Sequence, residues 1–217
     1  MISKLKNIKI IVTAGPTREY LDPVRFISNE SSGKMGYAIA DLLYHYGADV
    51  TLISGPVAIK SSLPIENIVQ VKTASEMYDA CKNHFDTTAI AIFSAAVADY
   101  RPQFQSDCKI KKADQVATVT FIKNVDIAFE FGKLKTDQQI AIGFALETND
   151  IIENATKKCK TKNFNAIVLN SPKEGEGFGF DTNKVAILNN KGKIKFFPLK
   201  SKQEVASDII NELIQIL

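Results

Sequence analysis

The stretch IKIIVTAGPTREYLDPVRFISNESSGKMG, residues 8–36, decides the fold of this 217-residue chain. It opens with a continuous apolar run, Ile8–Ala14, which ends at Gly15-Pro16, and a helical pattern begins at Gly33. A short run that is apolar on both faces is typical of a strand in a parallel sheet covered by helices. The stretch therefore predicts the first strand and the first helix of an α/β domain.

The rest of the chain repeats this alternation. Further apolar runs occupy residues 49–54, 68–72, 88–95, 139–145 and 165–170. Helical patterns occupy residues 33–46, with Gly47 as the C-terminal stop, 73–85, with Thr73-Ala-Ser-Glu76 as a capping box, 149–162 and 201–217. We therefore predict one domain over residues 1–217, built on a doubly wound and mainly parallel sheet.

Two stretches interrupt the alternation. Residues 101–123 hold a polar loop followed by a strand-like segment at 116–123, and residues 184–198 form a hairpin pattern around Asn190-Lys191-Gly192. We expect them to form an antiparallel appendage or edge beside the parallel sheet. The glycine-rich stretch 173–180 is predicted to be a mobile loop that closes over the substrate.

Composition excludes several classes of protein. The chain has 27 Lys+Arg and 24 Asp+Glu, a net charge of +3, which is too small for binding nucleic acid by bulk electrostatics. No apolar run approaches the roughly 20 residues that span a bilayer, and the N-terminus lacks a signal-peptide pattern. The three cysteines fit no zinc or disulfide framework, so we expect a reducing cytoplasm.

The first strand–helix connection is the first candidate site. It is too long for a dinucleotide-binding fingerprint, and it is not a P-loop because Met35 stands where that motif has Ser or Thr. Ser31-Ser32-Gly33 nevertheless leads into a helix N-terminus, which is a natural anion site. Two readings remain, a solvated helix cap and a pocket for a phosphate or carboxylate.

The ends of later strands offer further candidates. Small residues from Ser94 to Ala98 would let a flat ligand approach the backbone, and Asp99 could hold ribose hydroxyls, although simple packing explains the small residues equally well. Phe144 could stack on a base or belong to the core. The lysine-rich segment 109–112 fits either a triphosphate clamp or a solvated surface. The lysines of 157–162 crowd one helix end, where lysine commonly just compensates the helix dipole. The pattern shows no metal-ligand spacing and no nucleophile–base motif.

Together these motifs resemble the phosphopantothenate–cysteine ligases. The resemblance rests on segments in the family's order across nearly the whole chain: TAGPTRE at 13–19, LDPVR at 21–25, ISNESSGKMG at 27–36, AAVADYRP at 95–102, KIKK at 109–112, NVDI at 124–127 and GFALET at 143–148. It implies a Rossmann-like fold with a dimerisation region, and a homodimer. It also implies an enzyme of coenzyme A biosynthesis that joins 4′-phosphopantothenate to L-cysteine using CTP and Mg²⁺.

The resemblance implies roles for particular residues. Asn29 would contact an acyl-cytidylate intermediate, with Arg25 in the same loop, and Lys109 would reach the triphosphate, in the partner subunit's site. The remaining CTP contacts would come from Phe93, Ser94, Ala95, Asp99, Val125, Asp126, Ile127, Ala128, Phe144, Lys158 and Lys162.

The match has departures and rivals. The family's usual Asn-Pro-Asp-Ile is Asn124-Val-Asp-Ile127 here, and Leu146 replaces a usual alanine. Many bacterial relatives carry a flavin-dependent decarboxylase before this domain, so a separate phosphopantothenoylcysteine decarboxylase is an expected partner. The rival hypotheses are an NAD(P)-dependent reductase and a non-catalytic nucleotide-binding relative. The resemblance alone favours CTP over ATP.

Overall fold

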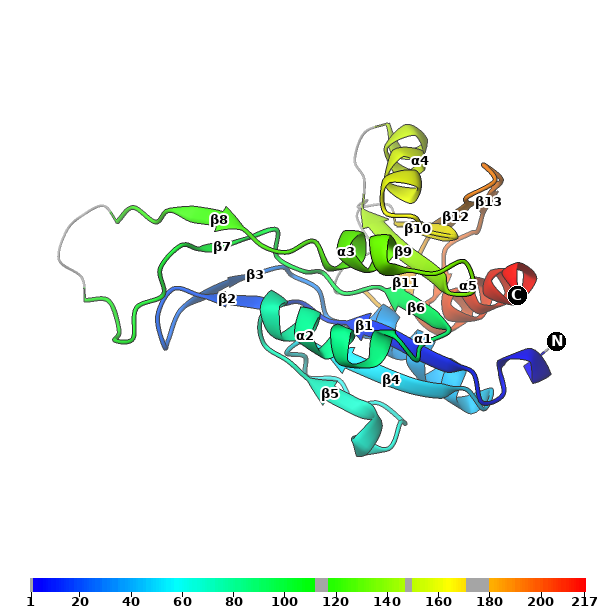
Figure 1. Ribbon diagram of the computed structural model, residues 1–217, viewed down its shortest axis with the longest axis horizontal. Helices are drawn as coiled ribbons and strands as arrows, with labels where there is room; N and C mark the ends of the chain where they lie inside the picture. Colours follow the sequence, from blue (N-terminus) through cyan, green and yellow to red (C-terminus); the bar gives the residue numbers. More distant parts are fainter. Residues whose placement is uncertain (1, 112–116, 147–149, 171–179) are drawn as a thin grey trace.

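A computed structural model describes residues 2–111, 117–146, 150–170 and 180–217. Its centre is one eight-stranded sheet in the order β13-β12-β10-β9-β6-β1-β4-β5 (Figure 1). The central strands are β1 (Lys9–Ala14), β4 (Asp49–Ser54), β5 (Ile68–Gln70), β6 (Ile90–Phe93), β9 (Ile140–Leu146) and β10 (Ala166–Asn170). All of these pair in parallel.

Numbered in chain order, the parallel strands lie in the order 3-2-1-4-5-6, which is that of the dinucleotide-binding fold. The predicted doubly wound sheet is therefore confirmed. The hairpin of β12 (Val185–Asn189) and β13 (Ile194–Phe196) continues the sheet antiparallel to β10, as expected for an edge. The direction of winding reverses between β1 and β6, so the two halves of the sheet diverge at that point.

Helices cover both faces of the sheet. Helices α1 (Lys34–His45) and α5 (Lys202–Ile216) pack on one face, where Val12, Leu52 and Ile92 are fully buried. Helices α2 (Ala74–Phe85), α3 (Ile127–Leu134) and α4 (Ile151–Thr161) cover the other face, around Phe131 and Phe164. Because neighbouring strand residues face opposite layers, the continuous apolar runs in the sequence supply both cores.

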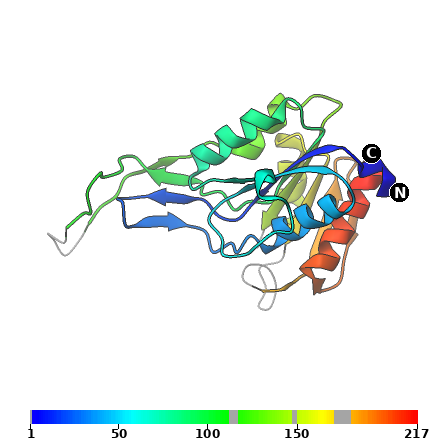
Figure 2. The ribbon, with the colours of Figure 1, turned by 90° about the horizontal axis from the view of Figure 1, so that it is seen from below.

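An extended arm leaves the body of the domain. It consists of two antiparallel ribbons, β2 (Arg18–Tyr20) with β3 (Phe26–Ser28) and β7 (Tyr100–Pro102) with β8 (Phe121–Lys123). Figures 1 and 2 show the ribbons running side by side away from the sheet. The backbone N–H of Ser106 donates to the carbonyl of Leu21 at 2.9 Å, which joins them. The second ribbon is the antiparallel appendage expected from residues 101–123.

The structure differs from the prediction in four places. The connection expected to be a loop contains the β2–β3 hairpin, and α3 was not predicted. The strand expected at 116–123 occupies only Phe121–Lys123 of the part described. At the start of α2, Thr73 accepts from Glu76 N–H as predicted, but the Glu76 carboxylate accepts from Lys72 N–H, so the capping box is not reciprocal.

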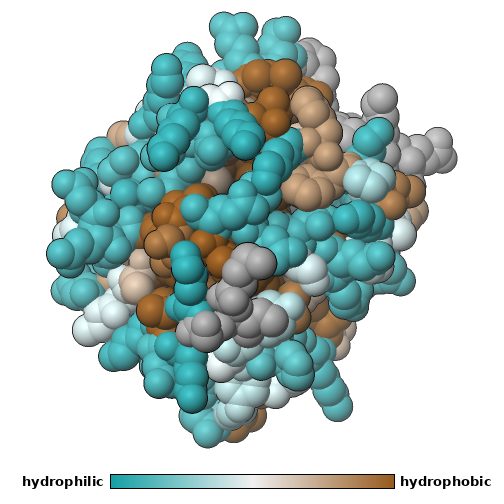
Figure 3. Space-filling view, turned by 90° about the vertical axis from the view of Figure 1, so that its right-hand side faces the viewer, coloured by the Kyte–Doolittle hydropathy of each residue, from teal (hydrophilic) through white to brown (hydrophobic). Residues whose placement is uncertain are grey.

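A short two-stranded element, β11 (Thr182–Asn183) with β14 (Lys200–Ser201), lies at the start of α5. The predicted loop at 173–180 lies outside the described residues except for Phe180. In the part of the chain that is described, no helix is long and apolar enough to cross a membrane. On the side of the molecule where the termini lie, hydrophobic residues gather in separate patches among hydrophilic ones (Figure 3).

Candidate functional site

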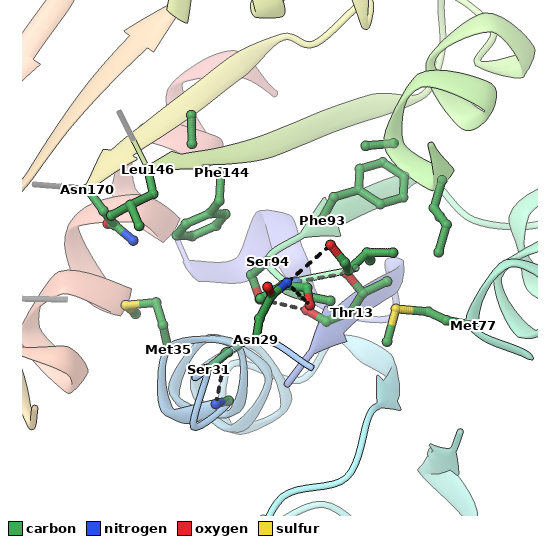
Figure 4. Close-up of a pocket in the computed structure, with 18 of the residues that line it drawn as sticks. Thr13, Asn29, Ser31, Met35, Met77, Phe93, Ser94, Phe144, Leu146 and Asn170 are labelled. Atoms are coloured by element: carbon green, nitrogen blue, oxygen red, sulfur yellow. Dashed lines mark hydrogen bonds between the residues drawn. The ribbon is translucent and has the colours of Figure 1, made fainter. Parts of the chain in front are cut away.

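A cavity of about 450 Å³ opens at the carboxyl ends of the central strands. Its wall includes Thr13 near the end of β1, Phe93 at the end of β6, Phe144 on β9 and Asn170 at the end of β10. In Figure 4, Asn29 and Ser94 lie between the rings of Phe144 and Phe93. Doubly wound sheets bind their ligands at this position, where the strand order reverses.

Three glycines bring α1 close to the strands. Gly15 and Gly33 both have positive φ (75° and 76°), and a Cβ built on Gly33 would lie 3.3 Å from the Gly15 Cα. A Cβ on Gly36 would lie 2.5 Å from Ser94 Oγ and 2.6 Å from Ala14 Cβ. In the dinucleotide fingerprint, glycines likewise allow a tight turn after the first strand and close packing of the helix on the strands. The β2–β3 hairpin is therefore an insertion between the first and second glycines of that pattern.

The glycine pattern alone does not make this a dinucleotide-binding site. Dinucleotide folds hold the ribose through an Asp or Glu about 20 residues after the glycines. Here the strand next to β1 ends at Ser54, which is fully buried and hydrogen-bonds to the Tyr37 hydroxyl at 2.8 Å. The missing carboxylate argues against the reductase hypothesis.

Asn29 lies at the base of the arm and lines the cavity. Its Nδ2 donates to the carbonyl oxygens of Ala96 (2.9 Å) and Val97 (3.2 Å) in the segment after β6. These bonds direct the amide oxygen away from both carbonyls. The side chain is thus oriented by backbone groups, with its oxygen available to a ligand.

Lys158 of α4 and Lys162, the residue that follows this helix, lie at the end of the cavity formed by α3. Lys158 and Lys162 both line it, and Lys162 Nζ lies 2.8 Å from Asp126 Oδ2. Asp126 also caps α3 by accepting from Phe129 N–H at 3.1 Å. This carboxylate therefore holds Lys162 in place at a helix N-terminus, where both the lysine and the helix dipole favour an anion.

Most of the residues transferred from the family resemblance meet in this cavity. Those that line it are Asn29, Phe93, Ser94, Ala95, Asp99, Val125, Asp126, Ile127, Ala128, Phe144, Lys158 and Lys162. Phe93 is mostly buried and stacks with Phe131 and Phe164, so its ring belongs to the aromatic core beneath the cavity. The functional roles of these residues stay predictions.

Arg25 and Lys109 lie elsewhere, on the arm. Lys109 is exposed, and the Arg25 side chain is half-exposed. Arg25 Nη2 donates to the carbonyl of Ile110 at 2.6 Å, so the two motifs are in contact although 85 residues separate them. Of the basic run at 109–112, Lys112 lies outside the described residues.

Three polar residues of the cavity were missed in the sequence. Asn170 ends a predicted strand, so its place at a carboxyl end was a usable signal. Asn183 comes from the short β11 strand, which no apolar period marks, and Lys202 comes from the first turn of α5, a helix that was predicted without its place in the cavity. Both are buried.

The strand order and the cavity at its switch point define a Rossmann-like α/β domain that binds its ligand across the carboxyl ends of the strands. Within that class, the chain belongs to the family described as the DNA/pantothenate metabolism flavoprotein C-terminal domain, which it matches over residues 5–217. This match confirms the family resemblance drawn from the motifs.

Several relatives support the assignment. The chain is 43% identical over 210 residues to the coenzyme A biosynthesis bifunctional protein CoaBC of Bacillus subtilis, covering 96% of this chain and 52% of that protein. It is 46% identical to a protein from an unknown prokaryotic organism named cysteine/cysteine sulfinic acid decarboxylase, covering 98% of this chain and 60% of that protein. The chain thus spans between half and three fifths of these relatives.

Solved structures of related proteins have the same fold. A crystal structure of the C-terminal domain of CoaBC is 41% identical and superposes with a TM-score of 0.80, covering 98% of both chains. The DNA/pantothenate metabolism flavoprotein from Streptococcus pneumoniae shares the fold, with a TM-score of 0.81 at 22% identity, over 97% of this chain and 100% of that one.

Proposed function

We propose that the protein is a ligase of coenzyme A biosynthesis that joins 4′-phosphopantothenate to L-cysteine. The substrate carboxylate attacks the α-phosphate of CTP, which gives an acyl-cytidylate and releases pyrophosphate. The amine of cysteine then attacks the acyl carbon, an amide forms, and CMP leaves. One observation carries the proposal: the residues named by the ligase motifs, from separate segments of the chain, line a single cavity at the switch point.

The charge of the cavity fits the first step. Attack of a carboxylate on a triphosphate brings like charges together, and cations that offset this repulsion lower the barrier. Lys158 and Lys162 supply positive charge at one end, next to the N-terminus of α3. Mg²⁺ would accompany the nucleotide and neutralise charge on its phosphates.

Asn29 suits the reacting group. Its amide is neutral, and its Nδ2 is already engaged by the carbonyls of Ala96 and Val97. The remaining oxygen can accept a hydrogen bond from the intermediate without adding a charge that would repel the substrate carboxylate. We propose this orientation as its contribution to the acyl transfer.

The arm is proposed to form the homodimer and to carry Lys109 into the partner's site. It exposes aromatic side chains, with Tyr100 51% exposed, Phe121 43% and Phe26 40%. Exposed aromatic residues on a ribbon are well suited to pairing with a second copy. Contact with a partner would also explain a lysine-rich loop outside the cavity of its own chain.

We further propose a cytoplasmic enzyme that hands its product to a phosphopantothenoylcysteine decarboxylase. The three cysteines are free thiols in the structure, which suits a reducing compartment. The fused relatives, described as bifunctional in coenzyme A biosynthesis, support a second activity acting beside this one.

The deciding experiment is an assay of pyrophosphate release. Purified protein is incubated with phosphopantothenate, cysteine and Mg²⁺, and CTP, ATP, GTP or UTP is added in turn. We expect release with CTP that requires phosphopantothenate, and amide product only when cysteine is present. No release with any of the four nucleotides would rule out the ligase. The reductase hypothesis is tested by following NADPH oxidation in the same samples.

A further inference from the structure

The chain between β6 and β7, residues 94–99, carries groups on which the site depends. The carbonyls of Ala96 and Val97 accept from Asn29 Nδ2 and so orient its amide (Figure 4). Apart from a bridge between Ala96 and Pro16, this segment forms no strand pairs within the part of the chain that the structure describes. Its backbone is therefore fixed by other contacts, and these decide where the Asn29 oxygen points.

Two threonines hold one side of this segment. Thr17 Oγ1 accepts from the N–H of Ala98 at 3.0 Å, and Thr13 Oγ1 accepts from the N–H of Ala95 at 3.2 Å. Both threonines are buried, with 0% and 2% of their surface exposed. Their hydroxyls thus take the place of the carbonyls that β1 would offer if its pairing with β6 continued. Loss of the Thr17 hydroxyl would leave the N–H of Ala98, a buried residue, without its partner.

Thr17 also bonds to the chain that leads into Asn29. Its carbonyl accepts from the hydroxyl of Ser28 at 2.7 Å, and its own N–H donates to the carbonyl of Ala96 at 3.4 Å. Thr17 therefore contacts both sides of the Asn29 hydrogen bonds, the residue before Asn29 and the segment that accepts from it. A shift of Thr17 would change where the Asn29 amide meets its acceptors.

Asn124 holds the carbonyl of the same alanine. Its Nδ2 donates to the carbonyl of Ala98 at 2.8 Å, and its backbone N–H donates to the carbonyl of Asp99 at 2.8 Å. Both backbone polar groups of Ala98 are therefore bonded to side chains, which come from two distant segments of the chain. The ligase motifs contain Thr17, Ser28 and Asn124, yet the function proposed above gives none of them a role.

We propose that Thr17 and Asn124 are positioning residues for the acyl transfer, which act by fixing Ala98 between them. With Ala98 fixed, the carbonyl of Val97 beside it meets Asn29 Nδ2 in one geometry, and the amide oxygen keeps one direction. Groups that are held in this way need no reorganisation when the substrate reacts. The inference rests on the proposed function, because that function gives the Asn29 oxygen its partner, the acyl-cytidylate.

The test removes one hydrogen bond at a time and keeps the shape of the site. Thr17→Val has the size of threonine but no hydroxyl, whereas Thr17→Ser keeps the hydroxyl. Asn124→Ala removes the bond to the carbonyl of Ala98. Thr88→Val is the matched control, because Thr88 is also buried and bonds through its hydroxyl to a backbone carbonyl, but it lies before β6 at the amino ends of the strands. Each change is made in the wild type and in Asn29→Ala.

We expect Thr17→Val to lower kcat for amide formation about tenfold or more, with the KM for CTP changed less than about threefold. Asn124→Ala should also lower kcat. Thr17→Ser should recover most of the loss, and Thr88→Val should show none. In Asn29→Ala, the changes at Thr17 and Asn124 should have a further effect of less than about twofold, because residues that act through one another are not additive.

A second measurement does not depend on activity. Nuclear magnetic resonance of ¹⁵N-labelled protein shows the side-chain amide of Asn29, which is identified by its absence from Asn29→Ala. Exchange of its protons with solvent should quicken about threefold or more in Thr17→Val and Asn124→Ala, and not in Thr88→Val, because hydrogen bonds protect amides from exchange. Denaturant unfolding shows that each variant is folded. If Thr17→Val does not fold, Asn124→Ala carries the same test.

Two results would overturn the inference while the ligase stands. Equal losses of kcat from Thr17→Val in the wild type and in Asn29→Ala would show that Thr17 does not act through Asn29. Unchanged exchange of the Asn29 amide would show that Thr17 and Asn124 support the fold alone. A wild type that released no pyrophosphate would refute the ligase and with it the part in acyl transfer, while the exchange rates would still decide whether the two residues hold Asn29.

Discussion

Asp22 holds the guanidinium of Arg25 through two hydrogen bonds to one carboxylate oxygen, from Nε at 3.0 Å and from Nη2 at 2.5 Å. The same oxygen accepts the backbone N–H of Ile110 at 3.0 Å, and Arg25 donates to the carbonyl of Ile110. The Asp22 side chain is fully buried although it lies on the arm. The pair therefore fixes both backbone groups of the residue that follows Lys109.

We expect Asp22→Asn to release this loop. The variant loses the ion pair with Arg25, so Lys109 should explore more positions and the kcat/KM for CTP should fall on the order of tenfold. The sheet should remain folded, because the pair lies outside both cores. Hydrogen exchange of the Ile110 amide measures the release directly. Asp137→Asn, at an exposed turn, is the control. Unchanged exchange at Ile110 would remove Asp22 from this role.

The same pair predicts a dependence of stability on pH. Arg25 lowers the pKa of Asp22 well below the ordinary value of 3.8. A carboxyl whose pKa is lower in the folded state stabilises the fold fully above its unfolded pKa, and this contribution is lost as the pH falls below that value. The difference in unfolding free energy between wild type and Asp22→Asn should be constant from neutral pH to about pH 5 and shrink below it. A difference that grew on acidification would contradict this.

Asn29→Asp should impair the chemistry more than nucleotide binding. The new carboxylate would face the carbonyls of Ala96 and Val97, which now accept from Nδ2. It would also repel the substrate carboxylate. We expect kcat to fall by roughly 100-fold or more, with the Kd for CTP changed less than about threefold. Stopped-flow or single-turnover kinetics separate the two quantities. A variant that turned over normally would show that the oriented amide is not needed.

The sequence predicted the regular alternation of strands and helices. Six apolar runs became the parallel strands. All but the edge strand β5 have buried residues on both faces of the sheet, which leaves a continuous apolar signal. The β2–β3 hairpin was missed because its strands have three residues each and lie on the arm, where no helix covers them. Helix α3 was missed because Ile127–Leu134 is short, although Asp126 is a recognisable cap.

The residues of the candidate site also fall into those that the sequence predicted and those that it did not. Residues at the ends of predicted strands, such as Ser94 and Phe144, were found because parallel strands end at one edge of the sheet. Asn183 could not be found, because a two-residue strand carries no period. Lys202 lies in a helix that was predicted, but the pattern of that helix does not show that its first turn faces the strand ends. Their place in the cavity follows from the return of the chain after β10, which only the three-dimensional fold supplies.

Lys109→Ala tests whether the arm serves a second subunit. We expect a raised KM for CTP with the fold intact, because Lys109 is exposed. Mixing the Lys109→Ala and Asn29→Asp variants then tests whether Lys109 completes the site of the partner subunit. If Lys109 acts across the dimer, Lys109 of the Asn29→Asp chain completes the site of the Lys109→Ala chain, so each hybrid dimer has one intact site of two. About half of the reassembled dimers are hybrids, so mixing should restore roughly a quarter of wild-type activity. No recovery after verified subunit exchange would place Lys109 in its own chain's site.

Gly36→Ala tests the close approach of α1 to the strands. An added Cβ would meet Ser94 Oγ and Ala14 Cβ at 2.5 and 2.6 Å, so the helix must move away from β1 and β6. We expect a loss of about 1–3 kcal/mol in unfolding free energy, and weaker binding of CTP because the N-terminus of α1 shifts from the cavity.

Gly47→Ala is the control for this substitution at the other end of α1. Its φ of +82° makes alanine strained, but the nearest atom to a new Cβ is 3.7 Å away. It should cost roughly 1–2 kcal/mol through the backbone alone and leave CTP affinity unchanged. Denaturant unfolding and calorimetry on both variants give the comparison. Equal CTP affinity in the two variants would mean that the position of the α1 N-terminus does not matter for the nucleotide, and the anion site would have to be assigned to the lysines alone.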